Sequence, residues 1–267
     1  MSNDCRLTRL IIRLFALSRV QHDKVCAFTL AEVLITLAII GVVAAMTIPT
    51  LMQKTDERET ISKLKKHYSE LAQAYSLAKV ELGTPDDWIG TSTPGSQAAA
   101  IKIGNVLTEK MKILKTCNAT SGCWANVNYK KLDGSNISFI INSSNVLSKY
   151  ILADGTCIAF YSRESYDAAG QFGHLEKIYG SIFVDINGAK SPNIWGRDAF
   201  LFFITNNGII SSGVQSITKA DTSFPGVCNK DSCTGNCQAC VAWVIYNDNM
   251  DYLHCSGLSW EGKRKCN

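Results

Sequence analysis

The first hydrophobic pattern along the chain is an almost unbroken apolar segment near its start. After Glu32 the apolar run continues to Thr50 and is interrupted only by small residues, two threonines and Pro49. The 24 residues from Phe28 to Leu51 would form a helix of about 36 Å, enough to cross a hydrocarbon core of roughly 30 Å. The pattern therefore predicts one membrane-spanning helix over residues 28–51.

A helical stripe follows the polar stretch from Gln53 to Glu59. Its apolar residues recur at steps of three and four, which places them on one helix face, and they are Ile61, Leu64, Tyr68, Leu71, Tyr75, Ala78 and Leu82. Gly83-Thr84-Pro85 is a helix stop. We predict a helix from about Phe28 to Leu82, with residues 52–83 as an amphipathic part that packs on the chain's own head. A coiled coil is the alternative for the stripe, which is only about three heptads long.

The head, residues 84–267, has short apolar segments bounded by turn residues, a pattern typical of strands. The predicted strands are Asn136–Asn142, Tyr150–Leu152, Cys157–Tyr161, Gly180–Asp185, Phe200–Thr205, Ile209–Ser211 and Ala242–Tyr246. Residues 98–115 are predicted to form a short helix. Asp154-Gly155, Asn187-Gly188 and Asn207-Gly208 are hairpin signals, and the last is expected to form a two-residue turn. The fold class is α+β, with an antiparallel sheet laid on the helix stripe.

Residues 1–27 form a basic leader. They carry five Lys and Arg side chains against two Asp, and Arg13 interrupts their apolar patch, unlike an ordinary secretory signal. By the positive-inside rule this basic flank stays in the cytoplasm, and the rest of the chain crosses the membrane. We therefore expect a cytoplasmic N-terminus and a head on the far side.

A carboxylate inside the apolar segment is costly, because a charge in hydrocarbon costs roughly 2.5–3.5 kcal/mol on insertion scales. Glu32 ends the string Ala27-Phe28-Thr29-Leu30-Ala31-Glu32, which resembles the processing site of type IV prepilins and type II secretion pseudopilins. The resemblance implies that prepilin peptidase cuts between Ala27 and Phe28 and that Phe28 is then N-methylated. It also implies that Glu32 pairs with the terminal ammonium of a neighbouring subunit. Ala27 stands where glycine usually precedes the cut.

The resemblance further implies a structural subunit of a type II secretion or type IV pilus-like filament, assembled through the N-terminal helix. The implied partners are like and related subunits and a membrane platform driven by a separate ATPase. The implied location is the bacterial inner membrane, with one span and a periplasmic or extracellular head. Pro49 would mark a bend in the filament, or else a helix end at the membrane surface. The alternative function is a processed, anchored binding or adhesion protein that does not polymerise.

One loop of the head collects oxygen ligands. The segment from Asp185 to Asp198 resembles a D-x-N-G-x-K-x-P-N-x-x-G-x-D loop of type II secretion-like pseudopilins, and the resemblance implies a structural calcium ion. Asp185, Asn187 and Asp198 are the candidate ligands, because calcium takes six to eight hard oxygens. The other interpretation is a turn that needs no ion, since Asp and Asn cap turns and Gly188 supplies positive φ. No other cofactor is predicted.

Cysteine is abundant, with 11 in the chain, of which Cys5 and Cys26 lie in the leader. A head on the oxidising side of the membrane favours disulfides. We expect a local Cys117–Cys123 pair, while Cys157 is either free or joined to the cysteine-rich end. A zinc site built on the Cys-x-x-Cys pair Cys237 and Cys240 is the alternative to disulfides. A redox role for this pair is a weaker interpretation than either. The cysteine-rich end, residues 228–266, holds Cys228, Cys233, Cys237, Cys240, Cys255 and Cys266.

Catalytic motifs are missing from the sequence. It contains no phosphate-binding glycine loop, no H-E-x-x-H and no G-x-S-x-G. The histidines beyond the leader are scattered, and His67 is expected at the surface. The net charge of +4 falls to about +1 without the leader, so no nucleic-acid partner is predicted. We therefore expect a protein that is not an enzyme.

Overall fold

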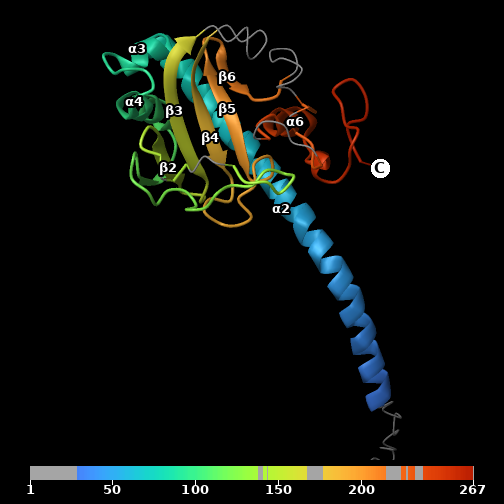
Figure 1. Ribbon diagram of the computed structural model, residues 1–267. Helices are drawn as coiled ribbons and strands as arrows, with labels where there is room; N and C mark the ends of the chain where they lie inside the picture. The colour runs from blue at the N-terminus through green and yellow to red at the C-terminus, as the bar shows by residue number, and fades with distance from the viewer. Residues whose placement is uncertain are drawn as a thin grey trace, which may run out of the picture. The chain divides into compact units, whose positions relative to one another are not determined.

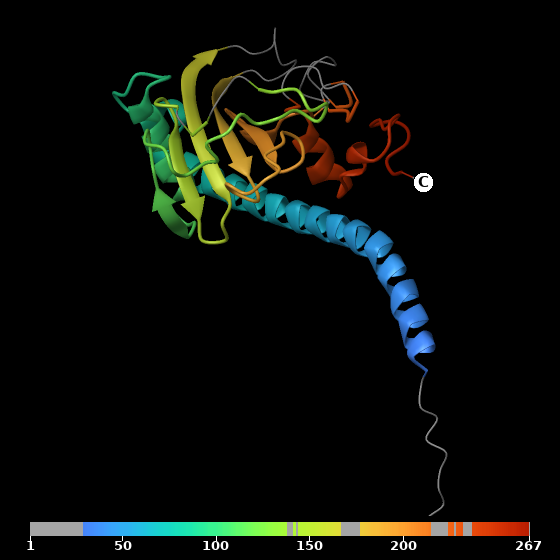
Figure 2. The same cartoon turned by 60° about the horizontal axis from the view of Figure 1, so that its bottom comes forward.

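The computed structural model describes residues 29–137, 141–142, 144–166, 177–214, 224–226, 228–231 and 237–266. The predicted leader, with the predicted cleavage site at Ala27 and Phe28, lies outside these residues. The chain divides into two compact units, Met1–Met52 and Gln53–Asn267. Helix α2 (Leu30–Leu82) contributes to both units, and Figures 1 and 2 show its course along the chain.

In the first unit, α2 presents its large apolar side chains to the surroundings. Their exposed fractions run from 42% at Val33 to 79% at Leu30. The helix does not end at Pro49, which lies inside α2. A continuous apolar surface of this size marks a site that lipid or another protein covers.

In the second unit, the apolar stripe of α2 is buried as predicted. The buried residues are Leu64, His67, Leu71, Tyr75 and Ala78. Tyr68 stacks on Phe202 with ring centroids 5.5 Å apart. Leu82 is 49% exposed, because the stripe leaves the core where the helix ends. The prediction that His67 lies at the surface is wrong, since its ring is 1% exposed.

In the described part of the chain, six antiparallel strands form one sheet in sequence order. Tyr150 and Ile158 are paired across β2 and β3 and share a sheet face with Phe202. Helices α2 and α4 (Gln97–Thr108) cover this face, as Figure 2 illustrates for α2. The α+β fold class is thus confirmed. The strands are β1 (Ile113–Thr116), β2 (Ser148–Leu152), β3 (Cys157–Tyr166), β4 (Ile178–Asp185), β5 (Ala199–Thr205) and β6 (Gly208–Ser211).

One predicted strand is wrong, and another lies partly outside the described residues. Ala242–Tyr246 lies in helix α6 (Cys240–Asn247), whose residues from Cys240 to Val244 are buried. The β-branched and aromatic composition of this segment suits a buried helix as well as a strand. Periodicity alone cannot distinguish a fully buried helix from a fully buried strand. In Asn136–Asn142 the described residues show one isolated bridge, at Asn136, and a turn at residues 141–142. The other predicted strands lie within β2 to β6.

Two boundaries also differ from the prediction. The β5–β6 turn uses Asn206 and Asn207, because Gly208 already pairs with Thr205. Gly208 carries the positive φ, 136°, inside the strand. The helix predicted for residues 98–115 ends at Thr108, because Ile113–Thr116 pair with β2 instead.

Short helices complete the described part of the second unit. Helix α3 (Pro85–Ile89) begins after Thr84, whose capping box with Asp87 follows the predicted helix stop. The 3₁₀ helix η1 (Asp251–Leu253) follows α6. Phe224 stacks on Trp243 of α6 with centroids 4.0 Å apart, and Trp260 packs against both rings. An aromatic cluster therefore forms the core of the cysteine-rich end.

Candidate functional site

The carboxylate of Glu32 lies in the first turn of α2 and caps the helix. Its Oε2 accepts hydrogen bonds of 2.8 Å from both the backbone N–H and the hydroxyl of Thr29, and the Thr29 hydroxyl accepts one from the Glu32 N–H at 3.2 Å. This is a reciprocal capping box, which satisfies two N–H groups that a helix start leaves unpaired. In the described chain both bonds to the carboxylate use Oε2, so Oε1 is available to a further donor.

The surroundings of Glu32 are apolar and exposed. Leu30, Val33 and Leu34 flank it with exposed fractions of 79%, 42% and 58%. Among the described residues, α2 is the one helix long and apolar enough to cross a membrane, by length and composition. The arrangement is a charged group at one end of a segment that needs lipid or another protein around it.

Residues 23–48 match the family model described as the prokaryotic N-terminal methylation motif. The chain carries a prepilin-type methylation motif. The motif is consistent with the type IV pilin and pseudopilin family, and it implies processing by prepilin peptidase and pilin-like partners. It is a structural motif rather than that of an enzyme family. Searches of curated proteins and of solved structures gave no significant match.

With its apolar helix, the prepilin-type motif fits a protein anchored in a membrane by a single span. The motif includes Ala27 and Phe28, which lie outside the described residues, and Glu32, whose geometry is given above. The matched segment ends at residue 48, just before Pro49. The comparison therefore concerns the helix, while the head is known from its structure alone.

The second candidate site is the loop between β4 and β5. Asp198 is 3% exposed and accepts from the N–H groups of Asn193 at 2.8 Å and Ile194 at 2.6 Å, and from Asn187 Nδ2 at 3.2 Å. Asp185 accepts from the hydroxyl of Tyr129. The structure thus brings the three predicted ligands, Asp185, Asn187 and Asp198, into one hydrogen-bonded loop.

The loop carboxylates are held in an environment that disfavours charge. Burial raises the pKa of Asp198 to about 6, against the hydrogen bonds that it accepts. Burial and the nearby charge of Asp198 raise the pKa of Asp185 well above its usual range. Each carboxylate would be stabilised by a cation, or by a proton, between them.

Three buried oxygens of this loop lack a hydrogen-bond partner among the described residues. They are Asp185 Oδ1, Asn187 Oδ1 and Asn193 Oδ1. A cleft of about 500 Å³ reaches the loop and is lined by Asn187, Ser191 and Asp198, among others. These oxygens and the carboxylate of Asp198 are the groups that could hold a hard cation, although Asp198 already accepts from three N–H donors.

Most of the described cysteines form disulfides. The pairs are Cys117–Cys123, Cys228–Cys240 and Cys255–Cys266, with S–S distances of 2.05, 2.02 and 2.15 Å, and Cys237 is also disulfide-bonded. Cys233 lies outside the described residues. The alternative of a zinc site is wrong, because these bonds consume the thiolates it would need. The described residues also contain no group of three His, Cys, Asp or Glu side chains placed to bind a metal.

Cys157 is a free, buried thiol. Burial and the charge of Asp185 raise its pKa to about 12. The thiolate is the reactive form of cysteine, so this residue is an inert part of the core.

Sequence reasoning missed three residues of these sites. The capping role of Thr29 has a local signal, because Thr-x-x-Glu before an apolar run is the signature of a capping box. Tyr129, which binds Asp185, is remote from the loop in sequence and gives no local signal. Asn193 is the third missed residue, and its φ of 56° is of a kind that asparagine tolerates better than most residues.

Proposed function

We propose that this chain is a pilin or pseudopilin subunit of a type II secretion or type IV pilus-like filament. In this proposal, prepilin peptidase cuts between Ala27 and Phe28, and Phe28 is N-methylated. The helix then assembles side by side with like and related subunits, on a membrane platform driven by a separate ATPase. The membrane is the bacterial inner membrane, with the head periplasmic or extracellular.

The observation that supports the proposal best is the position of Glu32. Its carboxylate lies in the first turn of an apolar, exposed helix, at the fifth residue after the proposed cut between Ala27 and Phe28. One oxygen is held by Thr29, and the other remains available for the ammonium of a neighbouring Phe28. A monomeric anchor would gain only the helix cap from this side chain, which an uncharged glutamine also provides, while the charge raises the cost of insertion.

The first test is the intact mass and N-terminal residue of the protein extracted from its native membranes. The proposal expects a chain that begins with N-methylated Phe28. A chain that begins at Met1 would contradict processing, and with it the filament. The same mass, compared with that of the reduced protein, counts the disulfides.

The second test separates charge pairing from helix capping, the two roles that the geometry gives Glu32. Glu32→Gln keeps an acceptor for Thr29, because glutamine also completes a capping box, but it has no charge. Glu32→Ala removes both. We expect both variants to insert into the membrane and neither to form filaments. Normal filaments from Glu32→Gln would leave capping as the role and refute charge pairing.

A matched control is available on the same helix. Glu59 pairs with Lys63 at 2.7 Å on the exposed surface of the second unit. Surface pairs of this kind contribute roughly 0–1 kcal/mol. Glu59→Gln should therefore assemble normally, which would show that a lost charge on α2 does not by itself prevent assembly.

The alternative function is a processed, membrane-anchored binding or adhesion protein that does not polymerise. The disulfide-stapled end of the head, residues 228–266, is the feature that favours it. This function predicts that Glu32→Gln leaves every property of the protein unchanged, and that cross-linking in native membranes yields no ladder of like subunits.

A structural calcium ion in the β4–β5 loop is a separate proposal. It is supported by the three unpartnered buried oxygens and by the raised pKa of both carboxylates. The test is the thermal midpoint of the full-length protein in detergent, in calcium or in chelator. We expect calcium to raise the midpoint of the wild type but not of Asp198→Asn. Asp133→Asn is the control, since Asp133 caps an exposed turn at Ser135. A thermal midpoint of the wild type that does not change with calcium would contradict the calcium site and favour a turn that needs no ion.

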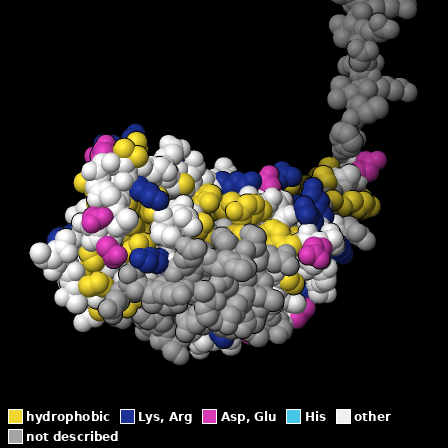
Figure 3. All heavy atoms as spheres, turned by 90° about the horizontal axis from the view of Figure 1, so that it is seen from above, with side chains coloured by type: hydrophobic (Ala, Val, Ile, Leu, Met, Phe, Trp, Pro, Cys, Tyr) yellow, Lys and Arg dark blue, Asp and Glu magenta, His cyan; other side chains and the backbone are white. Residues whose placement is uncertain are grey.

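No nucleic-acid partner is proposed. On the face of the molecule shown in Figure 3, Lys and Arg side chains are interspersed with Asp and Glu side chains. Binding to a polyanion is dominated by contacts from Lys and Arg to phosphates. A mixture of signs on this face gives no support to such a partner.

A further inference from the structure

Lys149 of β2 is a buried charged group that neither proposed site uses. Its side chain is 0% exposed and is among the largest fully buried side chains of the described chain. It points to the sheet face opposite α2 and α4, since its neighbour Tyr150 shares the face of Phe202. Burying an ammonium without partners is very costly, so its surroundings need an explanation.

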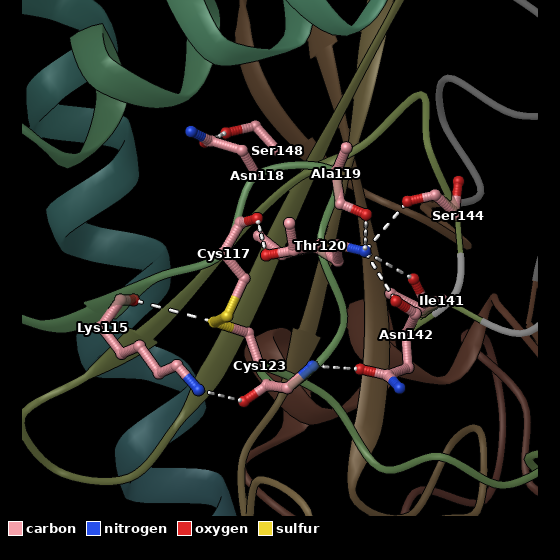
Figure 4. The surroundings of a disulfide bond; sticks show 12 residues. Lys115, Cys117, Asn118, Ala119, Thr120, Cys123, Ile141, Asn142, Ser144 and Ser148 are labelled. Carbon is pink, nitrogen blue, oxygen red and sulfur yellow. Dashed lines mark hydrogen bonds between the residues drawn. A yellow bond between two sulfur atoms is a disulfide. The ribbon is translucent and has the colours of Figure 1, made fainter.

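Four backbone carbonyls surround the Lys149 ammonium. Its Nζ lies 2.7 Å from the oxygen of Asn142 and 2.9 Å from that of Ser144, with longer contacts of 3.3 Å to Ala119 and 3.5 Å to Ile141. Figure 4 shows the dashed lines from these four labelled residues meeting at one nitrogen. None of the ion pairs of the described residues joins this lysine to a carboxylate.

All four contacts need a donor on the nitrogen, because a carbonyl oxygen can only accept. An ammonium supplies three N–H donors, whereas a neutral amine supplies two. Burial lowers the pKa of Lys149, and the carbonyl oxygens oppose this effect by solvating the charged form. Four acceptors in a cage around one nitrogen match an ammonium, with its three N–H donors, better than an amine, with two.

We propose that the carbonyls of Ala119, Ile141, Asn142 and Ser144 form a monovalent cation site, which this chain fills with its own Lys149 ammonium. Rings of backbone carbonyls replace the hydration shell of potassium in ion channels by the same physics. The site lacks carboxylates, which suits a single positive charge. Its ligand class is an ammonium ion or a primary alkylammonium.

The site joins two segments that are distant in sequence. Ala119 lies within the loop closed by Cys117–Cys123, and the other three carbonyls belong to residues 141–144. A second contact joins the same segments, because Asn142 Oδ1 accepts from Gly122 N at 2.8 Å. Lys149 of β2 therefore links the loop closed by Cys117–Cys123 both to the sheet and to residues 141–144.

Chemical rescue tests the site in the full-length protein in detergent. Lys149→Ala removes the atoms from Cγ to Nζ, and propylammonium replaces them one for one. We expect Lys149→Ala to melt well below the wild type, and propylammonium to raise its midpoint in a saturable manner. The neutral isostere 1-propanol should not do so. Equal rescue by 1-propanol would overturn the proposal, because it would show that the space is filled rather than the charge bound.

Lys102→Ala is the matched control. The Lys102 ammonium donates to one backbone carbonyl, that of Ile89, at 2.8 Å. A single carbonyl is not a cage, so propylammonium should leave the midpoint of this variant unchanged. An equal response of both variants would overturn the assignment of a specific site.

The wild type provides a test that does not depend on a folded variant. Acetylation of lysines in the native protein, read by mass spectrometry, should be at least about tenfold slower at Lys149 than at the exposed Lys115, and equal in the denatured protein. Comparable native rates would overturn the proposal. With the disulfides reduced, the protection of Lys149 should persist, and its loss would show that the disulfide rather than the cation holds the loop.

Discussion

Truncation of Leu71 tests whether the second half of α2 packs on the head. Leu71 is 0% exposed, while Leu77, six residues further along the same helix, is 54% exposed. Leu→Ala at a fully buried site costs about 3 kcal/mol, from the lost transfer free energy and the cavity left behind. Leu77→Ala should change stability by less than about 0.5 kcal/mol, since surface substitutions usually do.

The assay is urea unfolding of full-length protein in detergent, followed by the near-ultraviolet signal of the head aromatics. The same loss can also be read from thermal unfolding. For a unit the size of residues 53–267, a loss of about 3 kcal/mol in the free energy of unfolding corresponds to a fall in thermal midpoint of roughly 6–12 °C. Because Ala is the better helix former, Leu71→Ala loses nothing in helix propensity. The loss would therefore report packing and not helix formation.

Two results would refute this reasoning. Equal, small effects of Leu71→Ala and Leu77→Ala would mean that the stripe is not covered by the head. A urea midpoint that depends on protein concentration would mean that another copy of the chain covers the stripe, as in the coiled-coil alternative. An interface between chains responds to concentration by mass action.

Other predictions concern the head. Burial by itself raises the pKa of Asp154. The hydrogen bond from Lys66 and the charge of His67 outweigh burial and lower this pKa to about 2. The resulting stabilisation is present above about pH 4 and is lost as the pH falls through about 2. The free energy of unfolding in urea should therefore be lower for Asp154→Asn than for the wild type by up to about 1 kcal/mol at pH 7, and the two should converge below pH 2. Loss of the Cys117–Cys123 bond by serine substitution should cost about 2 kcal/mol in urea unfolding. Tyr75→Phe should cost about 1 kcal/mol, because its buried hydroxyl donates to a β5 carbonyl at 2.7 Å.

The long helix and most of the sheet were predictable, because their signals are local. An apolar run of membrane length, a stripe with helical spacing and short Ile- and Phe-rich segments each need few residues to be recognised. β1 was missed, since Leu114 and its neighbours are mostly exposed at a sheet edge and carry little pattern. α6 was mistaken for a strand because its residues from Cys240 to Val244 are all buried, which removes the periodicity that distinguishes the two.

The chemistry of the sites was predictable only where it is local in sequence. Thr29 and Glu32 are three residues apart, so their contact follows from helix geometry. His67 meets Asp154 at 3.1 Å and Glu70 at 2.9 Å, and the former contact depends on how the helix sits on the β2–β3 turn. The cage of Lys149 depends on carbonyl groups, which every residue has, so no residue type in the sequence could reveal it.

The two halves of α2 differ in what covers them. From Leu64 to Ala78 the chain's own head buries the stripe, whereas from Leu30 to Met52 the described chain contains nothing that does. In the proposed filament, lipid covers this part before assembly and neighbouring helices cover it afterwards. Lipid and neighbouring helices are about equally apolar, so burial alone gives little preference between them. In that filament Glu32 would supply the difference, because the roughly 2.5–3.5 kcal/mol that its charge costs in hydrocarbon would be recovered only where a neighbour brings an ammonium. In the proposed filament, the residue most costly to insert would therefore be the one that makes assembly favourable.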